Sequence, residues 1–438
     1  MINKILALIL IIAAALLLIH LRLDVYPENS PTLVLGLILL GAYCFGFLLE
    51  KIGSPRIVGY ILAGLLMGPF FLKLYTFSEV SDLAFINKLA LAFIAFCAGG
   101  ELRIKNIRKV LKSIISYISG VTIVVFMGTT TLVFVLSKTM FFMSDFNPTL
   151  RLAVSAIFGT IAVARSPSSA IAIISETKAK GRYTDIVLSV SVAMDVFIII
   201  LFAVIISLVQ VFIAGKGGLN LSLVYFLLAE IIIAFALGFI LGKFIVFLIE
   251  KVHVEFPVVI IAMGFIVIEF SHLLGDYLRQ TYDIGLELEP LLICMAAGFT
   301  VQNFSKHGEN FLERMDRVSL PVYIAFFAMT GASMDLNVLR TGWLLGLTVF
   351  VVRLLSIYVG SYVSGRIVKN EPKIYKNVWL GFITQAGVSL GLLTEVVRRF
   401  PEIGPSVQTI LVAAIIMNQI IGPIAFKYGL KKVGETNA

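Results

Sequence analysis

The chain has 438 residues, of which 59% are hydrophobic and only 14% are charged. Apolar runs of about 20 residues, the length that crosses a bilayer as a helix, recur along it, so the composition excludes a soluble globular protein and predicts an all-α polytopic membrane protein. The formal net charge is +9, but Lys and Arg gather in short connections between apolar runs. There they set orientation and do not indicate nucleic-acid binding.

The apolar runs predict about fourteen transmembrane helices. They cover 2–22, 32–50, 56–73, 82–100, 109–137, 150–175, 184–211, 222–250, 255–275, 287–303, 317–335, 342–365, 375–397 and 405–428. An even number puts both termini on one side, and the larger share of Lys and Arg there predicts that both are cytoplasmic, in a plasma membrane of the bacterial type. The first run has Lys4 before an apolar core, but no small-residue cleavage pattern precedes Leu21-Arg22, so we expect a retained helix.

The first of two informative interruptions lies within 150–175, at Ala164-Arg165-Ser166-Pro167-Ser168-Ser169. Hydrocarbon cannot satisfy the backbone groups that a break frees, so a break persists where it is buried in protein or lines a watery site. Ser166 is a good N-cap, Pro167 suits the first helical position, and Ser168 adds a hydroxyl in the first turn. Arg165 ends the preceding half-helix, where a cation offsets the negative end of the helix dipole. A proline kink in an ordinary packed helix is the alternative.

Asp195 lies in the middle of the next span, 184–211. An acid at this depth is costly and points to function. Because desolvation disfavours the charged form of a carboxyl group, a proton and a dehydrated monovalent cation can compete for the same oxygens. Ser191, one helical turn earlier on the same face, and Ser166 are expected to contribute further oxygens. A purely structural ion pair is the alternative.

The span 222–250 separates two sets of six spans, once the first span is set aside. As a single linker helix it reverses the second set relative to the first, which predicts inverted-topology repeats. Two further acids lie inside spans, Glu230 in this linker and Glu269 in 255–275. Glu269 is a candidate accessory group, although a hydrogen bond to a headgroup or a neighbouring helix is an alternative for both acids.

Arg353 is centred in 342–365, too deep to reach the interface easily. Two roles are open for it: a counter-charge to Asp195 in the empty carrier, or dipole compensation beside the second interruption. That interruption is Thr384-Gln385-Ala386-Gly387 within 375–397. Gly387 permits unwinding, and Thr384 and Gln385 can bond freed backbone groups. Both interruptions fall in the fifth span of their repeat, which is typical of a secondary transporter's binding site.

The sequence points to no cofactor and no enzyme. Cys44, Cys97 and Cys294 lie within apolar runs without metal-ligand spacing, so they predict neither a disulfide framework nor a metal site. Neither a cluster of His, Cys and acids nor a nucleotide-binding loop is present.

These residues give the chain a resemblance to the cation:proton antiporter superfamily, in particular its monovalent cation:proton antiporter-2 branch of sodium/proton and potassium/proton exchangers. The matching stretches follow the order and span positions of that branch. They are Pro55 to Gly64 with Gly68-Pro69, Ala98 to Leu102, Ser166-Pro167, Asp195, Phe326-Phe327 with Gly331 and Asp335-Leu336, Arg353, Gln385 to Gly387, and Asn418-Gln419 with Gly422-Pro423.

The resemblance implies a homodimer in which a core domain, holding two crossing broken helices, slides like an elevator against a dimerisation domain. It implies that Asp195 is the ion- and proton-binding acid and that Arg353 is its basic partner. The implied parts are an extra N-terminal helix (1–31), the dimerisation domain (32–104 and 255–339), the core transport domain (105–215 and 340–430), a linker helix (216–254) and a cytoplasmic tail (431–438).

Two departures from the family pattern bear on function. Met194 stands where relatives carry a second acid or an amide, and Arg165 stands where a polar oxygen ligand is usual. With one carboxylate cycling between proton and cation, we predict electroneutral exchange of sodium or potassium for protons, with a role in pH homeostasis. A proton-coupled carrier of an anion or small organic solute, using Arg165 and Arg353, is the alternative, and a channel-like or regulatory membrane protein is a third. Whether Arg165 blocks or builds the site is open at this level.

Overall fold

The computed structural model describes residues 31–214, 221–252, 255–282, 288–334, 336–385 and 387–436, together with Ala13 and Leu17. Apart from those two residues, the expected first span lies outside the described part. Every regular element within the described ranges is a helix, as the composition predicts.

Nine helices in the described part are long and apolar enough to cross a membrane. Two shorter apolar helices, α3 (Arg56–Met67) and α12 (Pro290–Phe304), coincide with expected spans. The expected span 317–335 lies in α13 (Gly308–Ala332), whose first half is charged. The helical membrane fold is therefore confirmed. The number fourteen is not reproduced by length and apolarity alone, because some of the expected spans are short, charged or broken.

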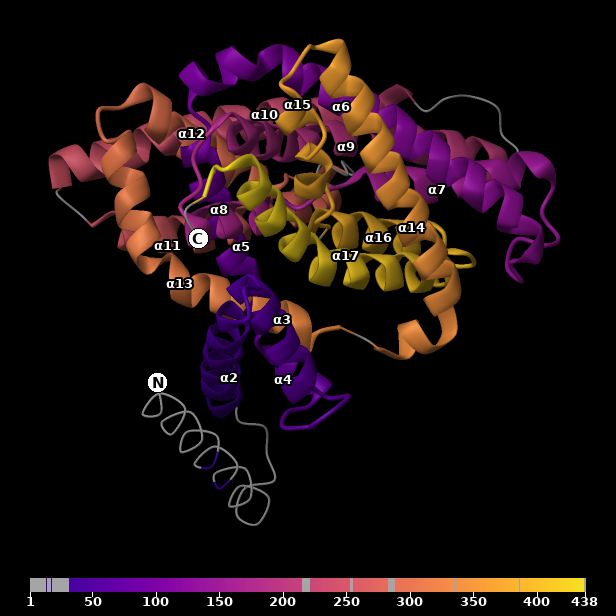
Figure 1. Cartoon of the computed structure of the whole chain (residues 1–438), viewed down its shortest axis with the longest axis horizontal. Coiled ribbons are helices and arrows are strands. Elements are labelled where there is room, and N and C mark those ends of the chain that lie inside the picture. The colour runs from indigo at the N-terminus through magenta and orange to yellow at the C-terminus, as the bar shows by residue number, and fades with distance from the viewer. Residues whose placement is uncertain are drawn as a thin grey trace.

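The helices pack in two groups (Figure 1), of which the first extends to the left of the view and the second to the right. The first group is formed by α2 (Pro31–Lys51), α3, α4 (Phe77–Asp82), α5 (Ala84–Glu101), α10 (Leu221–Phe247) with its π-helical end η2 (Leu248–Val252), α11 (Phe256–Tyr282), α12 and α13. The second group is formed by α6 (Ile104–Leu136), the short η1 (Ser137–Thr139), α7 (Pro148–Val163), α8 (Pro167–Thr177), α9 (Arg182–Ala214), α14 (Leu336–Ile367), α15 (Pro372–Tyr375), η3 (Val378–Phe382), α16 (Gly387–Arg399) and α17 (Gly404–Val433).

Glycines let α5 and α12 touch within the first group. A Cβ added to Gly99 would lie 1.9 Å from the carbonyl oxygen of Met295, and one added to Gly298 would lie 2.0 Å from that of Phe96. The two backbones are therefore in direct contact, which is the small-residue packing common between helices in membranes. This contact fixes where the first turn of α12 lies relative to α5.

Large apolar side chains cover the outer faces of several helices. Ile123 of α6, Ile232 of α10, Ile266 of α11 and Leu355 of α14 are all exposed. Water would penalise so much exposed apolar surface, whereas lipid does not. These faces fit contact with the hydrocarbon of a bilayer.

The helix α17 defines two opposite faces of the molecule. Its 30 residues rise by about 45 Å, so that Gly404 and Glu435, which lie at its two ends, are on opposite sides. We call these sides the Gly404 face and the Glu435 face. At the second, the carboxylate of Glu435 accepts hydrogen bonds from the backbone N–H groups of Tyr183 (2.7 Å) and Thr184 (2.8 Å) in the first turn of α9, where a negative charge is favourable.

Candidate functional site

The two interrupted helices meet at their breaks inside the second group. One break separates α7 from α8 and the other separates η3 from α16, so both lie where the sequence predicts. The backbone N–H of Ser166 donates to the carbonyl of Thr384 over 3.1 Å, and the Thr384 hydroxyl lies 3.5 Å from the carbonyl oxygen of Ser166. Each break thus satisfies backbone groups freed by the other, which lowers the cost of breaking a helix away from water.

Ser166 starts α8 as its N-cap. Its hydroxyl accepts a hydrogen bond from the backbone N–H of Ser169 (3.3 Å) and lies 3.2 Å from the Ser169 hydroxyl. Pro167 occupies the first helical position, where no N–H is needed. The local prediction for this break is therefore confirmed.

Arg353 of α14 joins the two breaks. Its Nε donates to the carbonyl of Ala162 (2.7 Å), Nη2 to that of Ala164 (3.0 Å) and Nη1 to that of Ile383 (2.7 Å). The side chain is 1% exposed, so these charge-assisted bonds replace all contact with water. The cation also sits at the C-terminal end of α7, where it offsets the negative end of the helix dipole.

Two amides complete this network, which we call the Arg353 network: Arg353 with Gln385 and Asn418. Asn418 of α17 accepts from Arg353 Nη1 (2.9 Å) and donates to Gln385 Oε1 (3.0 Å), and Gln385 Nε2 donates to the carbonyl of Ile161 (2.7 Å). A Cβ added to Gly422 would lie 2.8 Å from the backbone of Thr384, so a glycine is required for α17 to approach the break this closely.

Arg165 makes different contacts, although it lies in the same break. Its guanidinium stands over the ring of Phe382, 4.1 Å from the centroid, and the residue is 2% exposed. Its Nε and Nη1 have no hydrogen-bond partner within the described ranges. A cation–π contact is the main compensation that this buried charge receives.

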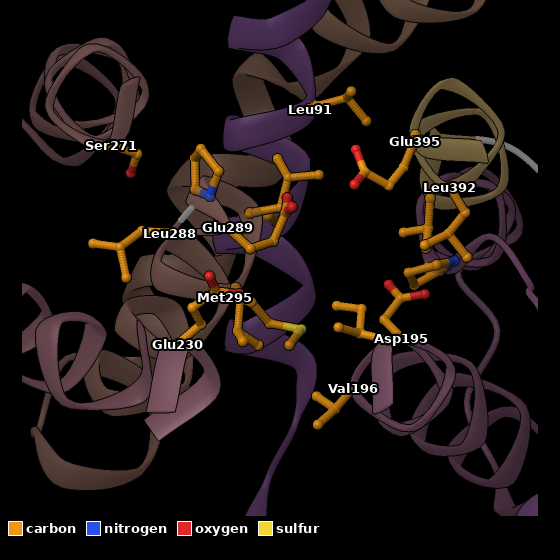
Figure 2. A pocket seen from close by; sticks show the side chains of 18 of the residues that line it. Leu91, Asp195, Val196, Glu230, Ser271, Leu288, Glu289, Met295, Leu392 and Glu395 are labelled. Carbon is orange, nitrogen blue, oxygen red and sulfur yellow. The ribbon is translucent and has the colours of Figure 1, made fainter. Parts of the chain in front are cut away.

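A cavity of about 930 Å³ opens between the two groups and extends to residues near the Gly404 face. Asp195 lies in its wall, and Figure 2 shows the carboxylate pointing into the space. The Oδ1 atom is buried without a hydrogen-bond partner in the described part of the chain. A buried acceptor without a partner is costly, and a bound proton or cation would relieve that cost.

Four of the predicted residues at the first break lie in the same cavity as Asp195. Ser166, Pro167 and Ser168 line it, and so does Arg165. Met194, the residue before Asp195, does not line the cavity. It is fully buried, and its Sδ lies 3.6 Å from the Thr122 hydroxyl of α6. Asp195 is therefore the acid of α9 that faces the cavity.

The structure adds acids that sequence reasoning did not single out. Glu289, at the N-cap of α12, lines the cavity from the first group, opposite Asp195 (Figure 2). Glu395 of α16 also lines it and pairs with Arg398 (2.8 Å) and with Arg399 of its own helix. An acid at a helix start or in an i,i+4 pair is ordinary in sequence, so only the tertiary arrangement reveals these two.

Other predicted residues, apart from Glu230, lie outside the cavity wall. Ser191 is 1% exposed and does not line it, because one turn along α9 moves it about 6 Å toward the Glu435 face. Glu269 is exposed on α11 and is not part of the wall, whereas Glu230 of α10 is. Thr384, Gln385 and Arg353 lie behind the wall, in the crossing itself. Arg353 and Asp195 form no ion pair among the described residues, and the guanidinium bonds the carbonyls at the two breaks instead.

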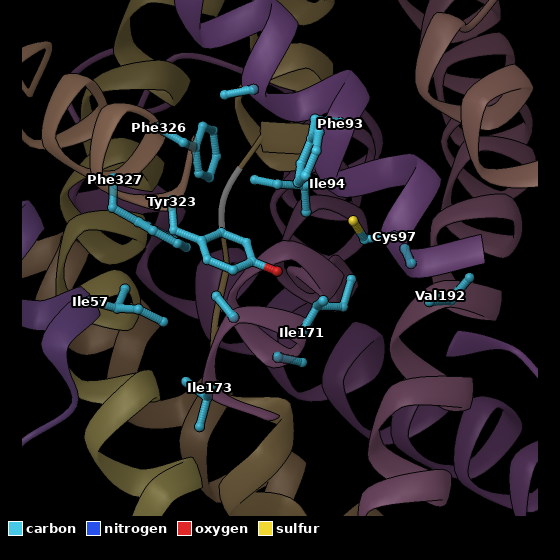
Figure 3. Close-up of a cluster of buried hydrophobic side chains, with 14 of the residues drawn as sticks. Ile57, Phe93, Ile94, Cys97, Ile171, Ile173, Val192, Tyr323, Phe326 and Phe327 are labelled. Carbon is cyan, nitrogen blue, oxygen red and sulfur yellow. The ribbon is translucent and has the colours of Figure 1, made fainter. Parts of the chain in front are cut away.

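An apolar cluster lies between the two groups (Figure 3) and reaches the cavity at Ile94 and Ile171. It brings together residues of the first group, on α3, α5 and α13, with residues of the second group, on α8 and α9. The members drawn with labels are Ile57, Phe93, Ile94, Cys97, Ile171, Ile173, Val192, Tyr323, Phe326 and Phe327. We call this the apolar barrier. Dry, close-packed contact of this kind resists the passage of ions.

These features define a secondary transporter: a helical membrane protein in which two broken helices cross beside an unpartnered acid in a cavity. The model of the transmembrane sodium/hydrogen exchanger family matches residues 35–432, and the chain belongs to this family.

Two relatives match most of the chain. A Na⁺/H⁺ antiporter of Enterococcus hirae is 23% identical over 407 residues, which is 91% of this chain and 98% of that protein. A probable Na⁺/H⁺ antiporter of Methanocaldococcus jannaschii is 23% identical over 399 residues, with 87% and 92% covered. These relatives are named as transporters and not as enzymes.

Solved structures show the same fold. The sodium proton antiporter MjNhaP1 of Methanocaldococcus jannaschii at pH 8 superimposes with a TM-score of 0.62, at 18% identity and covering 92% of this chain and 94% of that one. Its electron-microscopy structure gives a TM-score of 0.71 at 19% identity, with 92% and 98% covered.

Proposed function

We propose that the protein exchanges sodium for protons across the membrane and that Asp195 binds the two ions alternately. The observation that carries this proposal is the unpartnered Oδ1 of Asp195 in a cavity whose wall also holds Ser166. A carboxylate oxygen in a cavity whose wall also holds a hydroxyl suits a dehydrated alkali cation, and the same oxygen accepts a proton. Family membership and the names of the relatives support sodium as the cation.

One carboxylate at the site favours one-for-one exchange. Met194 faces away from the cavity, and Glu395 is held by two arginines of its own helix. If Asp195 alone cycles, one proton leaves for each cation that binds, and the whole cycle moves no net charge. The membrane potential then leaves the exchange equilibrium unchanged, since it is worth about 2.3 kcal/mol per 100 mV only for a charge that moves across.

The second group is the moving part in this proposal, and the first group is the fixed part and the dimer contact. The apolar barrier supports such a motion because its members meet through apolar atoms, which can slide without breaking hydrogen bonds. Displacing the second group across this barrier would close the cavity on the Gly404 face and open a path on the Glu435 face. This is elevator-like alternating access.

The test is Asp195→Asn in proteoliposomes with an imposed proton gradient, with sodium, potassium, lithium and chloride tried in turn. The amide keeps the shape of the side chain but cannot hold a proton and a cation alternately, so we expect exchange to be lost while the protein stays folded. Glu269→Gln is the matched control, because it removes an exposed acid outside the cavity, and it should exchange normally. Sodium-dependent proton flux at the parent rate in Asp195→Asn would contradict the proposal.

The same vesicles test charge movement and substrate. Clamping the potential with valinomycin at either sign should leave the sodium equilibrium unchanged. A shifted equilibrium would mean that a second acid, such as Glu289, takes part. Flux driven by chloride but not by alkali cations would favour the anion carrier.

A further inference from the structure

The N-terminus of α3 is capped by the other group of helices. Pro55, its N-cap residue, offers no side-chain hydrogen bond, so the first N–H groups of α3 need partners from elsewhere. The backbone N–H of Arg56 donates to Glu176 Oε2 over 3.0 Å. Glu176 belongs to α8, so a carboxylate of the second group closes the helix start of the first.

The other oxygen of Glu176 holds a lysine that also spans the groups. Lys427 of α17 pairs with Glu176 Oε1 at 3.3 Å and donates to the carbonyl of Ser54 at 3.2 Å. The side chains of Lys427 and Glu176 are 8% and 12% exposed. In a site this dry, each charge depends on the other, because removing one leaves its partner buried and unpaired.

A third polar contact lies next to these. The hydroxyl of Ser175 in α8 donates to Asp316 Oδ1 of α13. All three contacts join the two groups at the Glu435 face, where the chain past α17 meets the start of α9. They therefore lie on the side opposite the cavity mouth.

We propose that Glu176 and Lys427 are positioning residues that hold the transporter open toward the Gly404 face. The helix α8 starts at the Ser166 cap in the cavity and ends beside Glu176, about 16 Å away over its 11 residues. Because a helix moves as a rod, fixing its far end to α3 also fixes Ser166 against the cavity. The role rests on the proposed alternating access: the second group can move only after the Arg56, Ser54 and Asp316 contacts release.

The test measures accessibility to a membrane-impermeant maleimide and needs no transport. One reporter is the native Cys97, 6% exposed in the apolar barrier, in a protein with Cys44→Ala and Cys294→Ala. The other is Leu392→Cys in the cavity wall, in a protein with all three native cysteines replaced by alanine. We expect Glu176→Gln and Lys427→Met each to speed labelling at Cys97 and to slow labelling at Leu392→Cys, by about fivefold or more.

Controls separate positioning from loss of structure. Lys427→Arg keeps the pair and should label like the parent. Glu309→Gln breaks an exposed pair with Arg103 and should change neither rate. Combining Glu176→Gln with Lys427→Met should change the labelling rates by no more than the larger single effect, since both substitutions remove the same Glu176–Lys427 contact.

Two results would overturn the role: unchanged labelling at both reporters in folded variants, or faster labelling at both, which indicates loosening. If Asp195→Asn still exchanges sodium, the proposed function fails, but the labelling rates still decide whether Glu176 and Lys427 set the position of α8.

Discussion

Replacing Arg353 by methionine tests how the crossing is held together. The substitution keeps a long apolar side chain but removes the donors for the carbonyls of Ala162, Ala164 and Ile383 and for the amide oxygen of Asn418. Each buried acceptor left without a partner costs about 1–3 kcal/mol, and relief of the buried charge offsets part of that sum. We expect a net loss of roughly 4 kcal/mol or more in the free energy of unfolding.

Thermal unfolding in detergent measures this loss. At roughly 1 °C per kcal/mol for a chain of this size, Arg353→Met should lower Tm by about 4 °C. Arg353→Lys should fall between parent and methionine, because an ammonium keeps the charge and three donors but not the planar fork. Arg366→Met on the same helix is the control, since Arg366 is exposed and stands over the Tyr362 ring at 5.7 Å. A Tm within 2 °C of the parent for Arg353→Met would refute the view that hydrogen bonds from the guanidinium stabilise the freed backbone groups of both breaks.

Three further outcomes follow from the site. Arg165→Met should keep Tm within about 1 °C of the parent or raise it, because it replaces a buried and poorly compensated charge by an apolar chain. A fall as large as that of Arg353→Met would show that Arg165 has a further stabilising partner. Glu289→Gln should raise the sodium concentration for half-maximal exchange about fivefold, since one charge acting across a partly hydrated cavity is worth about 1 kcal/mol. An unchanged concentration, measured from the Gly404 face, would show that Glu289 does not attract the cation. The protein should be a homodimer through its first group, and native mass measurement in lipid that finds only monomer at every concentration would contradict this.

Local signals allowed the breaks to be predicted. Ser-Pro-Ser-Ser after an apolar run predicts a new helix start from four adjacent residues. The structure has Ser166 as the N-cap and Pro167 at the first helical position. The partners of Arg353 could not be derived in this way. They lie as far as 191 residues away in the chain, and sequence restricted Arg353 to two roles without choosing between them.

The direction in which a polar residue faces was also beyond the sequence. The helices α10 and α11 are apolar on most sides, so no pattern told whether Glu230 or Glu269 faces inward. Only the packing of α10 against α12 places Glu230 in the cavity wall and leaves Glu269 exposed. Glu289 gave no signal, because an acid at a helix start is common for reasons unrelated to transport.

The two buried arginines also affect how an electric field acts on the carrier. An arginine essentially never loses its proton in a protein, so Arg165 and Arg353 travel as fixed charges with the second group in the proposed motion. The group then carries the same charge whether Asp195 holds sodium or a proton. A membrane voltage would favour either the state open toward the Gly404 face or the state open toward the Glu435 face, in the empty and in the loaded carrier, and so change turnover. It would do so equally for both substrates, which leaves the sodium gradient that the protein can build unaffected.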